Sequence, residues 1–91
     1  VSAAEMFASG MHSLRGATLV GTTSAGNTEN LYPYDFDDGA VLWLAEVLFR
    51  QRNGTYVDNV GVTPDIEVPD DTDITDLAHD PALQAALASF P

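Results

Sequence analysis

The 91-residue sequence predicts an α/β (α+β) fold, with a partial mixed sheet, a helix after a serine motif near the first residue, and a C-terminal helix. Three observations support this prediction. Apolar residues recur at helical spacing near the beginning, runs of β-branched and aromatic residues follow, and an Asp-Pro pair precedes a second apolar helical segment. With 45% apolar residues, the chain is too hydrophobic to be a disordered segment.

The first predicted helix covers residues 3–14, where apolar residues recur at i, i+4 and i+7 from Phe7 to Leu14. Ser2 is the expected N-cap of this helix. Glu5 follows three residues later and completes the Ser-x-x-Glu pattern of a capping box, in which each residue satisfies a free N–H group of the other.

Three short strands are predicted at residues 18–20, 31–36 and 66–68. Pro33 limits the second strand to a sheet edge or an irregular strand, because proline has no N–H to donate. Near the end of the chain, Asp80 and Pro81 form an N-cap and N1 pair. This pair predicts a last helix with Leu83 and Leu87 facing inward.

Residues 40–50 permit two interpretations. Their length and a pair of opposite charges at i, i+4 favour a helix. Asn53 and Gly54, however, form a strong hairpin-turn dipeptide between the apolar run 41–44 and the residues 56–57, which favours strands on both sides. The sequence pattern leans toward a strand.

The composition excludes several kinds of chemistry. The chain has no cysteine and no lysine, so thiolate catalysis, disulfides, thiolate metal sites and a lysine base cannot arise within it. Its net charge of −11 disfavours nucleic acid and anionic lipid as partners, and no run of about 18 apolar residues predicts membrane insertion. A chain of this size without disulfides or a metal has a small core, so we expect a portion of a larger domain.

No motif predicts a cofactor or a metal ion. Residues 21–28 have the glycine spacing of a phosphate-binding loop, but Asn27 occupies the place of the required lysine and no helix follows. Residues 69–80 are expected to form an acidic loop before the last helix. Its carboxylates lack the glycine and the glutamate of a calcium-binding loop, which favours a solvated surface over a calcium site. They are Asp70, Asp71, Asp73 and Asp76.

Ser2 is also the position where a nucleophile gains most from a helix, because free N–H groups and the positive dipole end stabilise a nearby oxyanion. The spacing alone favours the other interpretation, a capping residue without a catalytic role. A nucleophilic serine also needs a base within hydrogen-bond reach. His12 lies nearly three turns along the helix and is expected to face solvent, and His79 is expected to be structural.

Four short segments follow one another in a characteristic order. They read Ser-Ala-Ala-Glu-Met-Phe at 2–7, Arg-Gly-Ala-Thr-Leu-Val-Gly at 15–21, Asp-Gly-Ala-Val-Leu at 38–42 and Gly-Val-Thr-Pro-Asp-Ile-Glu-Val at 61–68. In this order they resemble the C-terminal processing peptidases, the tail-specific serine proteases. The order of the four is more specific than any one of them, and the resemblance extends over nearly the whole chain.

The resemblance implies a serine-type endopeptidase that works through an acyl-enzyme. Ser2 matches the first serine of the family signature Ser-Ala-Ser-Glu, which is the nucleophile, and the N–H of Ala3 contributes to the oxyanion hole. Glu5 and Asn27 are secondary candidates, because Asn27 occupies the position of the lysine base found in one branch. The general base is therefore expected from upstream residues not in this chain, and the isolated fragment is expected to be inactive.

Residues 58–65 are similar to the Glu-Asn-x-Gly-Val-x-Pro-Asp pattern of the tricorn-core branch, which uses a histidine upstream of the serine. Asp58 stands in the acidic place, which implies a carboxylate that orients the base. The alternative is an exposed carboxylate beside a hairpin. The resemblance also makes 40–50 a strand.

The resemblance further implies that residues 1–91 are the C-terminal portion of one peptidase catalytic domain. Its partners would be a peptide or protein substrate and the remaining N-terminal part of the same protein. The family suggests a location in the cell envelope (periplasm) or outside the cell. The alternative function is a non-catalytic ligand-binding homologue of the same fold.

Overall fold

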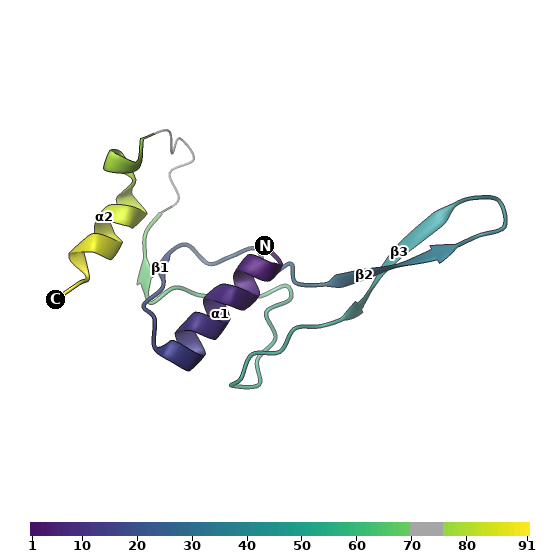
Figure 1. The fold of residues 1–91 in the computed structure, drawn as a ribbon, viewed down its shortest axis with the longest axis horizontal. Helices are drawn as coiled ribbons and strands as arrows, with labels where there is room; N and C mark the ends of the chain where they lie inside the picture. Colours follow the sequence, from purple (N-terminus) through teal and green to yellow (C-terminus); the bar gives the residue numbers. More distant parts are fainter. Residues whose placement is uncertain (70–75) are drawn as a thin grey trace.

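The computed structural model describes residues 1–69 and 76–91. Figure 1 shows an elongated arrangement, 59 × 33 × 16 Å, in which a central helix lies between a projecting hairpin and a C-terminal helix. The elements are α1 (Ala3–Arg15), β1 (Val20–Gly21), β2 (Asn30–Asp35), β3 (Val41–Val47), β4 (Ile66–Glu67), the 3₁₀ turn η1 (Leu77–His79) and α2 (Pro81–Ala88). Two helices with parallel and antiparallel strand pairs confirm the predicted α+β class.

Helix α1 begins and ends where its sequence predicts. Ser2 precedes it, and Gly16 ends it in a left-handed conformation with φ of 67°. The N–H of Gly16 donates to the carbonyl of His12 at 3.1 Å, which satisfies one carbonyl of the last turn. Glycine adopts this conformation without the steric penalty that a Cβ would bring.

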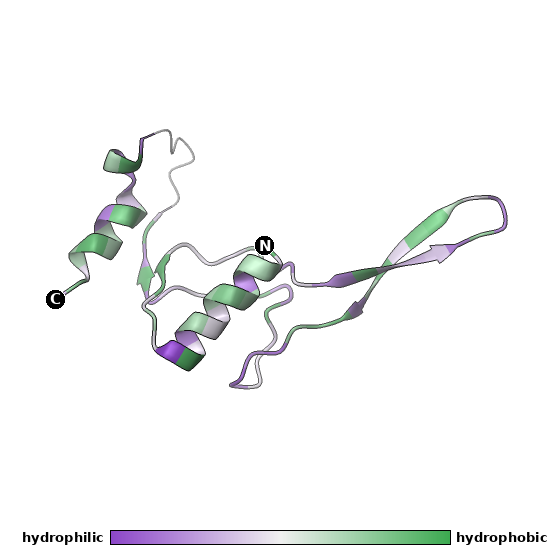
Figure 2. Ribbon diagram, viewed as in Figure 1, coloured by the Kyte–Doolittle hydropathy of each residue, from purple (hydrophilic) through white to green (hydrophobic). Residues whose placement is uncertain are grey.

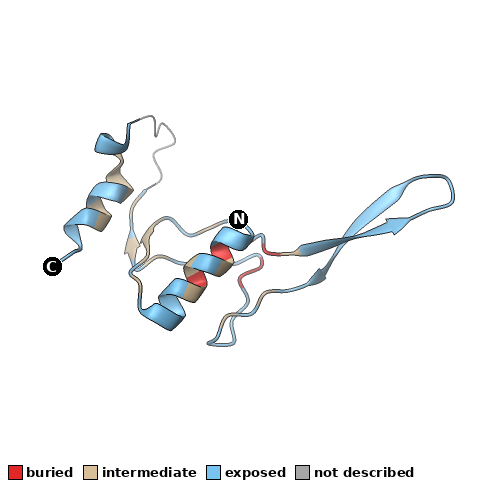
Figure 3. Ribbon diagram, in the orientation of Figure 1, coloured by how far each residue is buried: buried red, intermediate tan, exposed pale blue. Residues whose placement is uncertain are grey.

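The face that α1 buries is polar. Glu5 and Ser9 are only 2% and 3% exposed, whereas Phe7 and Leu14 are 70% and 62% exposed. Figure 3 shows the buried positions on one side of α1, toward the loops that cross beneath it. The helical spacing of the apolar residues therefore predicted the helix correctly. The described residues, however, do not bury these apolar side chains.

Strands β1 and β4 form a parallel pair beside α1. Val20 pairs with Ile66 and Gly21 with Glu67. The backbone of Leu19 extends this contact, because its N–H donates to the Asp65 carboxylate at 2.8 Å. These bonds bring together two segments more than forty residues apart and fix the course of the chain after α1.

Strands β2 and β3 form the antiparallel hairpin that projects from the rest of the chain (Figure 1). The strand interpretation of 40–50 is confirmed for 41–47, and the helical pattern was wrong. The partner strand also differs from the sequence expectation. Residues 41–47 pair with 30–35 and not with 56–57, since the hairpin closes through the turn at 36–40, where Phe36 N–H donates to the Ala40 carbonyl at 2.9 Å.

The Asn53-Gly54 turn is present, but it closes a smaller loop. Gln51 N–H donates to the Thr55 carbonyl at 2.8 Å, and Arg50 and Tyr56 form one antiparallel bridge. Gly54 has φ of 92°, which favours glycine at this position. The turn chemistry was therefore predicted correctly, whereas the length of the strands around it was overestimated.

The C-terminal helix α2 has the predicted start. Asp80 Oδ1 accepts hydrogen bonds from the N–H groups of Ala82 and Leu83 at 2.9 and 3.1 Å. The inward orientation predicted for Leu83 and Leu87 is wrong for the described residues, since these side chains are 37% and 56% exposed. Of the predicted acidic loop at 69–80, residues 70–75 lie outside the described residues, and so do three carboxylates weighed as calcium ligands.

Few apolar side chains are buried. Val57 and Val62 are the buried apolar residues in the described part of the chain. Figure 2 shows hydrophobic residues along the hairpin and on both helices, and Figure 3 shows most of these positions exposed. Within residues 1–69 and 76–91, no helix is both long and apolar enough to cross a membrane.

Candidate active site

Ser2 has an unusual backbone conformation at the start of α1. Its φ is 56° and its ψ is −126°, and Asn59 is the other non-glycine residue with positive φ in the described chain. A residue with a Cβ adopts such a conformation only when its surroundings hold it there. The Ser2 N–H donates to the Asn27 carbonyl at 2.6 Å and to Glu5 Oε2 at 2.8 Å.

The capping box predicted for Ser2 and Glu5 is present. The two side chains are placed as in a capping box, and the Glu5 carboxylate accepts from the Ser2 N–H at 2.8 Å. The Ser2 side chain faces the backbone N–H of Glu5 in this box, without a close side-chain hydrogen bond to the first turn.

The N–H groups next to Ser2 point out of the first turn of α1. The Ser2 carbonyl accepts from the N–H groups of Glu5 and Met6 at 2.9 and 3.2 Å, which begins the helical hydrogen-bond pattern. The N–H groups of Ala3 and Ala4 precede that pattern and lie at the positive end of the helix dipole. Such groups can stabilise an oxyanion that forms at Ser2.

Glu5 is the centre of the hydrogen-bond network under α1. Oε1 accepts from the Ser24 hydroxyl at 2.5 Å and from the Gly26 N–H at 2.6 Å, and Oε2 accepts from the Ser2 and Asn27 N–H groups at 2.8 and 3.1 Å. Burial raises the pKa of Glu5, but these hydrogen bonds together lower it to about 2. Glu5 is therefore a carboxylate at neutral pH. Three of its hydrogen bonds come from the loop at 24–27 and fix that loop against α1.

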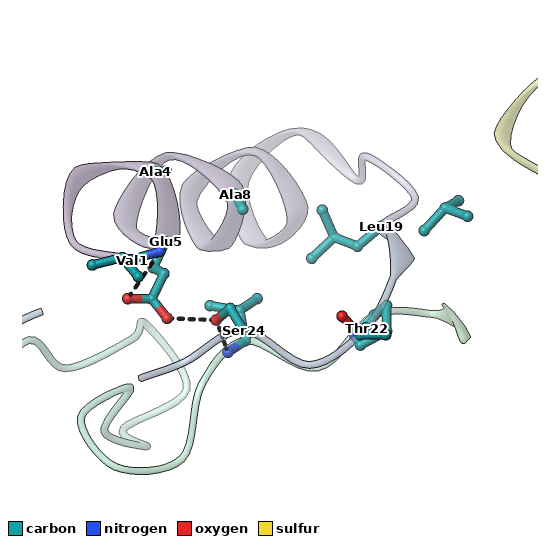
Figure 4. A pocket seen from close by; sticks show the side chains of 10 residues that line it. Val1, Ala4, Glu5, Ala8, Leu19, Thr22 and Ser24 are labelled. Atoms are coloured by element: carbon teal, nitrogen blue, oxygen red, sulfur yellow. Dashed lines mark hydrogen bonds and ion pairs between the residues drawn. The ribbon is translucent and has the colours of Figure 1, made fainter. Parts of the chain in front are cut away.

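Ser24 connects Glu5 to a third segment of the chain. Its hydroxyl donates to Glu5 and accepts from the Val62 N–H at 2.8 Å (Figure 4). The same side chains border a cavity of about 200 Å³ between α1 and β1, which Ala4, Ala8, Leu19 and Thr22 also line. The hydroxyl group is thus shared between a helix and the loop that leads to β4.

Asp58 is buried, so the alternative of an exposed carboxylate beside a hairpin is wrong. It is 7% exposed, and it accepts from the Thr28 hydroxyl at 2.6 Å and from the Phe49 N–H at 3.0 Å. The hydrogen bond from Thr28 lowers the pKa of Asp58, burial raises it, and the Phe49 N–H lowers it further, so the net pKa is below its ordinary value.

The loops at 24–28 and 57–62 pack backbone against backbone. Gly26 has φ of 75°, and a Cβ on it would lie 2.7 Å from the Gly61 nitrogen and 2.8 Å from the Val57 carbonyl oxygen. The Gly26 carbonyl accepts from the Asn59 N–H at 2.8 Å. This close approach brings the segment of Asp58 beside the loop that contacts Ser2.

The amino-acid sequence of this region matches the model of a known protein family. The sequence profile of peptidase family S41 covers residues 1–68, from the serine motif through β4. The chain belongs to peptidase family S41. No curated protein matches it in sequence. The prediction that the chain is related to the C-terminal processing peptidases is therefore confirmed. The match also supports a peptidase domain, and the serine type is typical of this family.

In this S41 chain, position 27 lies directly against the serine motif. The backbone of Asn27 bonds to both Ser2 and Glu5, while the residue itself is exposed. An amide side chain cannot take up a proton at neutral pH as a lysine or histidine can. The residue therefore occupies a position next to Ser2 without supplying a base.

Neither histidine of the S41 chain lies at the serine motif. His12 Nδ1 is 3.0 Å from the Ala17 carbonyl and 3.3 Å from the Asp65 carboxylate, at the other end of α1. His79 Nδ1 is 2.7 Å from Asp76, and its side chain is 85% exposed. Within the described residues, both therefore have partners away from Ser2.

Sequence reasoning did not single out Ser24 or Thr28. Both hydroxyls contact a buried carboxylate that is 19 or 30 residues away in sequence. A Thr-x-Ser-x-Gly loop carries no local signal of such a contact. The glycines were the only local indication, because Gly26 and Gly61 mark a close approach of two backbones.

Proposed function

We propose that residues 1–91 are the C-terminal portion of the catalytic domain of a serine-type endopeptidase, with Ser2 as its nucleophile. The observation that carries this proposal is the strained backbone of Ser2, with φ of 56° at the first turn of α1. A serine on a strained turn before a helix is the arrangement that exposes a nucleophilic hydroxyl next to free N–H groups. Membership in family S41 supports the same role.

The mechanism begins with attack of Ser2 Oγ on the scissile carbonyl carbon, which forms a bond to carbon and places negative charge on the carbonyl oxygen. The N–H of Ala3 donates to that oxyanion, together with a second donor from another part of the protein. The base takes the Ser2 proton and gives it to the amine nitrogen as the scissile C–N bond breaks, which leaves an acyl-enzyme. Water then gives a proton to the base and attacks the acyl carbon, and the C–O bond to Ser2 breaks as the base returns that proton to Ser2 Oγ.

The base comes from residues of the intact protein outside this chain. Lysine is absent from the sequence, and both histidines of the described structure are bound elsewhere. We assign it to a histidine upstream of Ser2, as in the tricorn-like branch. Asp58, ionised at neutral pH, would orient that histidine with the oxygen lone pairs that Thr28 and Phe49 leave free.

Extensive exposed apolar surface supports the assignment to a portion of a domain. Phe7 and Leu14 on α1 and Trp43 on β3 are each more than half exposed. Covering apolar area of this kind with other parts of a domain stabilises the folded protein by about 25 cal/mol per Å². We therefore assign the missing cover to the remaining N-terminal part of the protein. On the family resemblance alone, we place the protein in the cell envelope or outside the cell.

The test is covalent labelling of the intact protein with a fluorophosphonate, which reacts with an activated serine. Labelling is expected on the peptide that contains Ser2, and Ser2→Ala should abolish it. Ser13→Ala is the matched control, because Ser13 lies on the same helix and its hydroxyl donates to the Ser9 carbonyl at 2.7 Å. Labelling that persists in Ser2→Ala would refute the assignment of the nucleophile.

A non-catalytic ligand-binding homologue is the second candidate function. The observation in its favour is that Asn27, next to Ser2, cannot act as a base, while a largely apolar cavity of about 200 Å³ borders α1. The two candidates differ in the sequence upstream of Ser2. A histidine there supports the peptidase, whereas its absence together with no fluorophosphonate labelling supports the binding protein.

A further inference from the structure

Ser24 and Val62 form a reciprocal pair of hydrogen bonds. The Val62 N–H donates to Ser24 Oγ at 2.8 Å, and the Ser24 N–H donates to the Val62 carbonyl at 3.2 Å. Gly61 permits this contact, because a Cβ at that position would collide with the Ser24 carbonyl. The backbone at 61–62 is therefore fixed to the backbone at 24.

The Ser24 hydroxyl extends this pair to the serine motif. It donates to Glu5 Oε1 at 2.5 Å, and the other oxygen of the same carboxylate accepts from the Ser2 N–H at 2.8 Å. Three consecutive hydrogen bonds thus run from Val62 through Ser24 and Glu5 to Ser2 (Figure 4 shows the first two). Glu5 is 2% exposed, so water does not readily replace any of its partners.

We propose that Ser24 is a positioning residue for the nucleophile, whose hydroxyl holds the Glu5 carboxylate at the angle that keeps the Ser2 backbone in its strained conformation. The proposal rests on the assignment of Ser2 as the nucleophile. Ser24 acts through Glu5, and it does not itself touch a substrate.

The chemistry of the position requires a hydroxyl. A hydroxyl donates one hydrogen bond and accepts others, so one small group can serve the Glu5 carboxylate and the Val62 N–H at once. An alanine would leave the Val62 N–H without its partner and remove one of the four donors to Glu5. The carboxylate would then be free to rotate and would hold the Ser2 N–H less firmly.

A role limited to stability predicts a different result. It would lower the melting temperature of a variant without changing the reactivity of the folded protein. A positioning role changes the rate of the covalent step at Ser2 and leaves binding of the reagent unchanged, because misplacement of a reacting group acts on the transition state.

The experiment measures inactivation of the intact protein by a fluorophosphonate over a range of concentrations, which separates the maximal rate kinact from the half-saturating concentration KI. The variants are Ser24→Ala and Ser24→Thr, at a temperature where circular dichroism shows each to be folded. Thr22→Ala is the matched control, since Thr22 lines the same cavity and is not among the donors to Glu5.

We expect Ser24→Ala to lower kinact by about tenfold or more with little change in KI, since small misplacements of reacting groups have effects of this size or larger. Ser24→Thr should restore most of the rate, because it keeps the hydroxyl, and Thr22→Ala should react like the wild type. If Ser24→Ala does not fold, Ser24→Cys replaces it, and the weaker hydrogen bonds of its thiol should give an intermediate kinact.

A folded Ser24→Ala or Ser24→Cys that reacts at the wild-type rate would overturn the proposal, and so would a folded Ser24→Thr as slow as Ser24→Ala. Both results leave Ser2 labelling in the wild type intact, so they refute only the role of Ser24. Absence of labelling in the wild type, or labelling that survives Ser2→Ala, would instead refute the proposed function, and the role of Ser24 with it.

Discussion

Thr28 and Asp58 are joined by a hydrogen bond between two loops, with the Thr28 hydroxyl 2.6 Å from Asp58 Oδ1 and both residues buried. Thr28 directly follows Asn27, whose carbonyl accepts from the Ser2 N–H. The bond therefore ties the Asp58 carboxylate to Thr28, the direct neighbour of the residue whose carbonyl holds the Ser2 N–H. The proposed orienting role of Asp58 depends on this relationship.

Thr28→Val should lower the melting temperature of the intact protein, because it removes the hydroxyl from a buried carboxylate while it keeps the size of the side chain. Thr28→Ser should remain near the wild type, since it keeps the hydroxyl. Differential scanning calorimetry at pH 7 measures both. Equal melting temperatures for Thr28→Val and Thr28→Ser would show that the hydrogen bond contributes nothing.

Glu5→Gln should destabilise the intact protein by about 1–3 kcal/mol, the usual cost of leaving buried donors without acceptors. The carboxylate accepts four hydrogen bonds, whereas the glutamine side chain has one acceptor oxygen and an NH₂ group that would face donors. Urea unfolding at pH 7 measures the change. Ser13→Ala serves as the control, because the bond that the described residues show for the Ser13 hydroxyl stays within its own helix, at the Ser9 carbonyl.

The stabilisation that Glu5 supplies should depend on acid pH. Its pKa is lowered from an ordinary value of 4.5 to about 2 in the folded protein. A lowered carboxylate pKa gives stability that is fully present above the unfolded value and is lost as the pH falls through the folded value. The difference in unfolding free energy between wild type and Glu5→Gln should therefore be constant above about pH 5 and shrink toward pH 2.

A difference that stayed constant from pH 7 to pH 2.5 would contradict the assignment of a lowered pKa to Glu5. The comparison with Glu5→Gln is needed because other carboxylates also titrate in this range, among them Asp58 and Asp76, whose pKa values are lowered as well. Those contributions are common to both proteins and cancel in the difference.

Gly26→Ala should destabilise the protein more than Gly39→Ala. Both glycines have positive φ, at 75° and 84°, so both substitutions carry a left-handed backbone penalty of about 1–2 kcal/mol. Only at Gly26 would the new Cβ also meet backbone atoms, at 2.7–2.9 Å, whereas Gly39 faces open space. Chemical denaturation of the two variants should give the larger loss for Gly26→Ala, and equal losses would argue against the close packing of the loops.

Residues 1–91 expressed alone should not hydrolyse peptides, because the proposed base lies elsewhere in the protein. A casein-release assay measures this, with the intact protein as the positive control. Hydrolysis by the isolated residues that Ser2→Ala abolishes would contradict the external base while it supports the nucleophile.

The sequence by itself determined the local features. The start of α1 at Ser2, the N-cap of α2 at Asp80 and the turn at Asn53-Gly54 were all predicted correctly, because capping and turn preferences depend on residues only a few positions apart. Motif order was also sufficient for the family, which matches over residues 1–68.

Only the tertiary structure decided which side chains meet. The periodicity of 40–50 could not separate helix from strand, and pairing of 41–47 with 30–35 settled it. The sequence suggested an N-cap partner in Glu5, but four donors, one at Ser2 and three in the loop at 24–27, make it a buried anion. Such contacts join residues 19 to 30 positions apart, as for Ser24 and Thr28, so no local spacing rule can encode them.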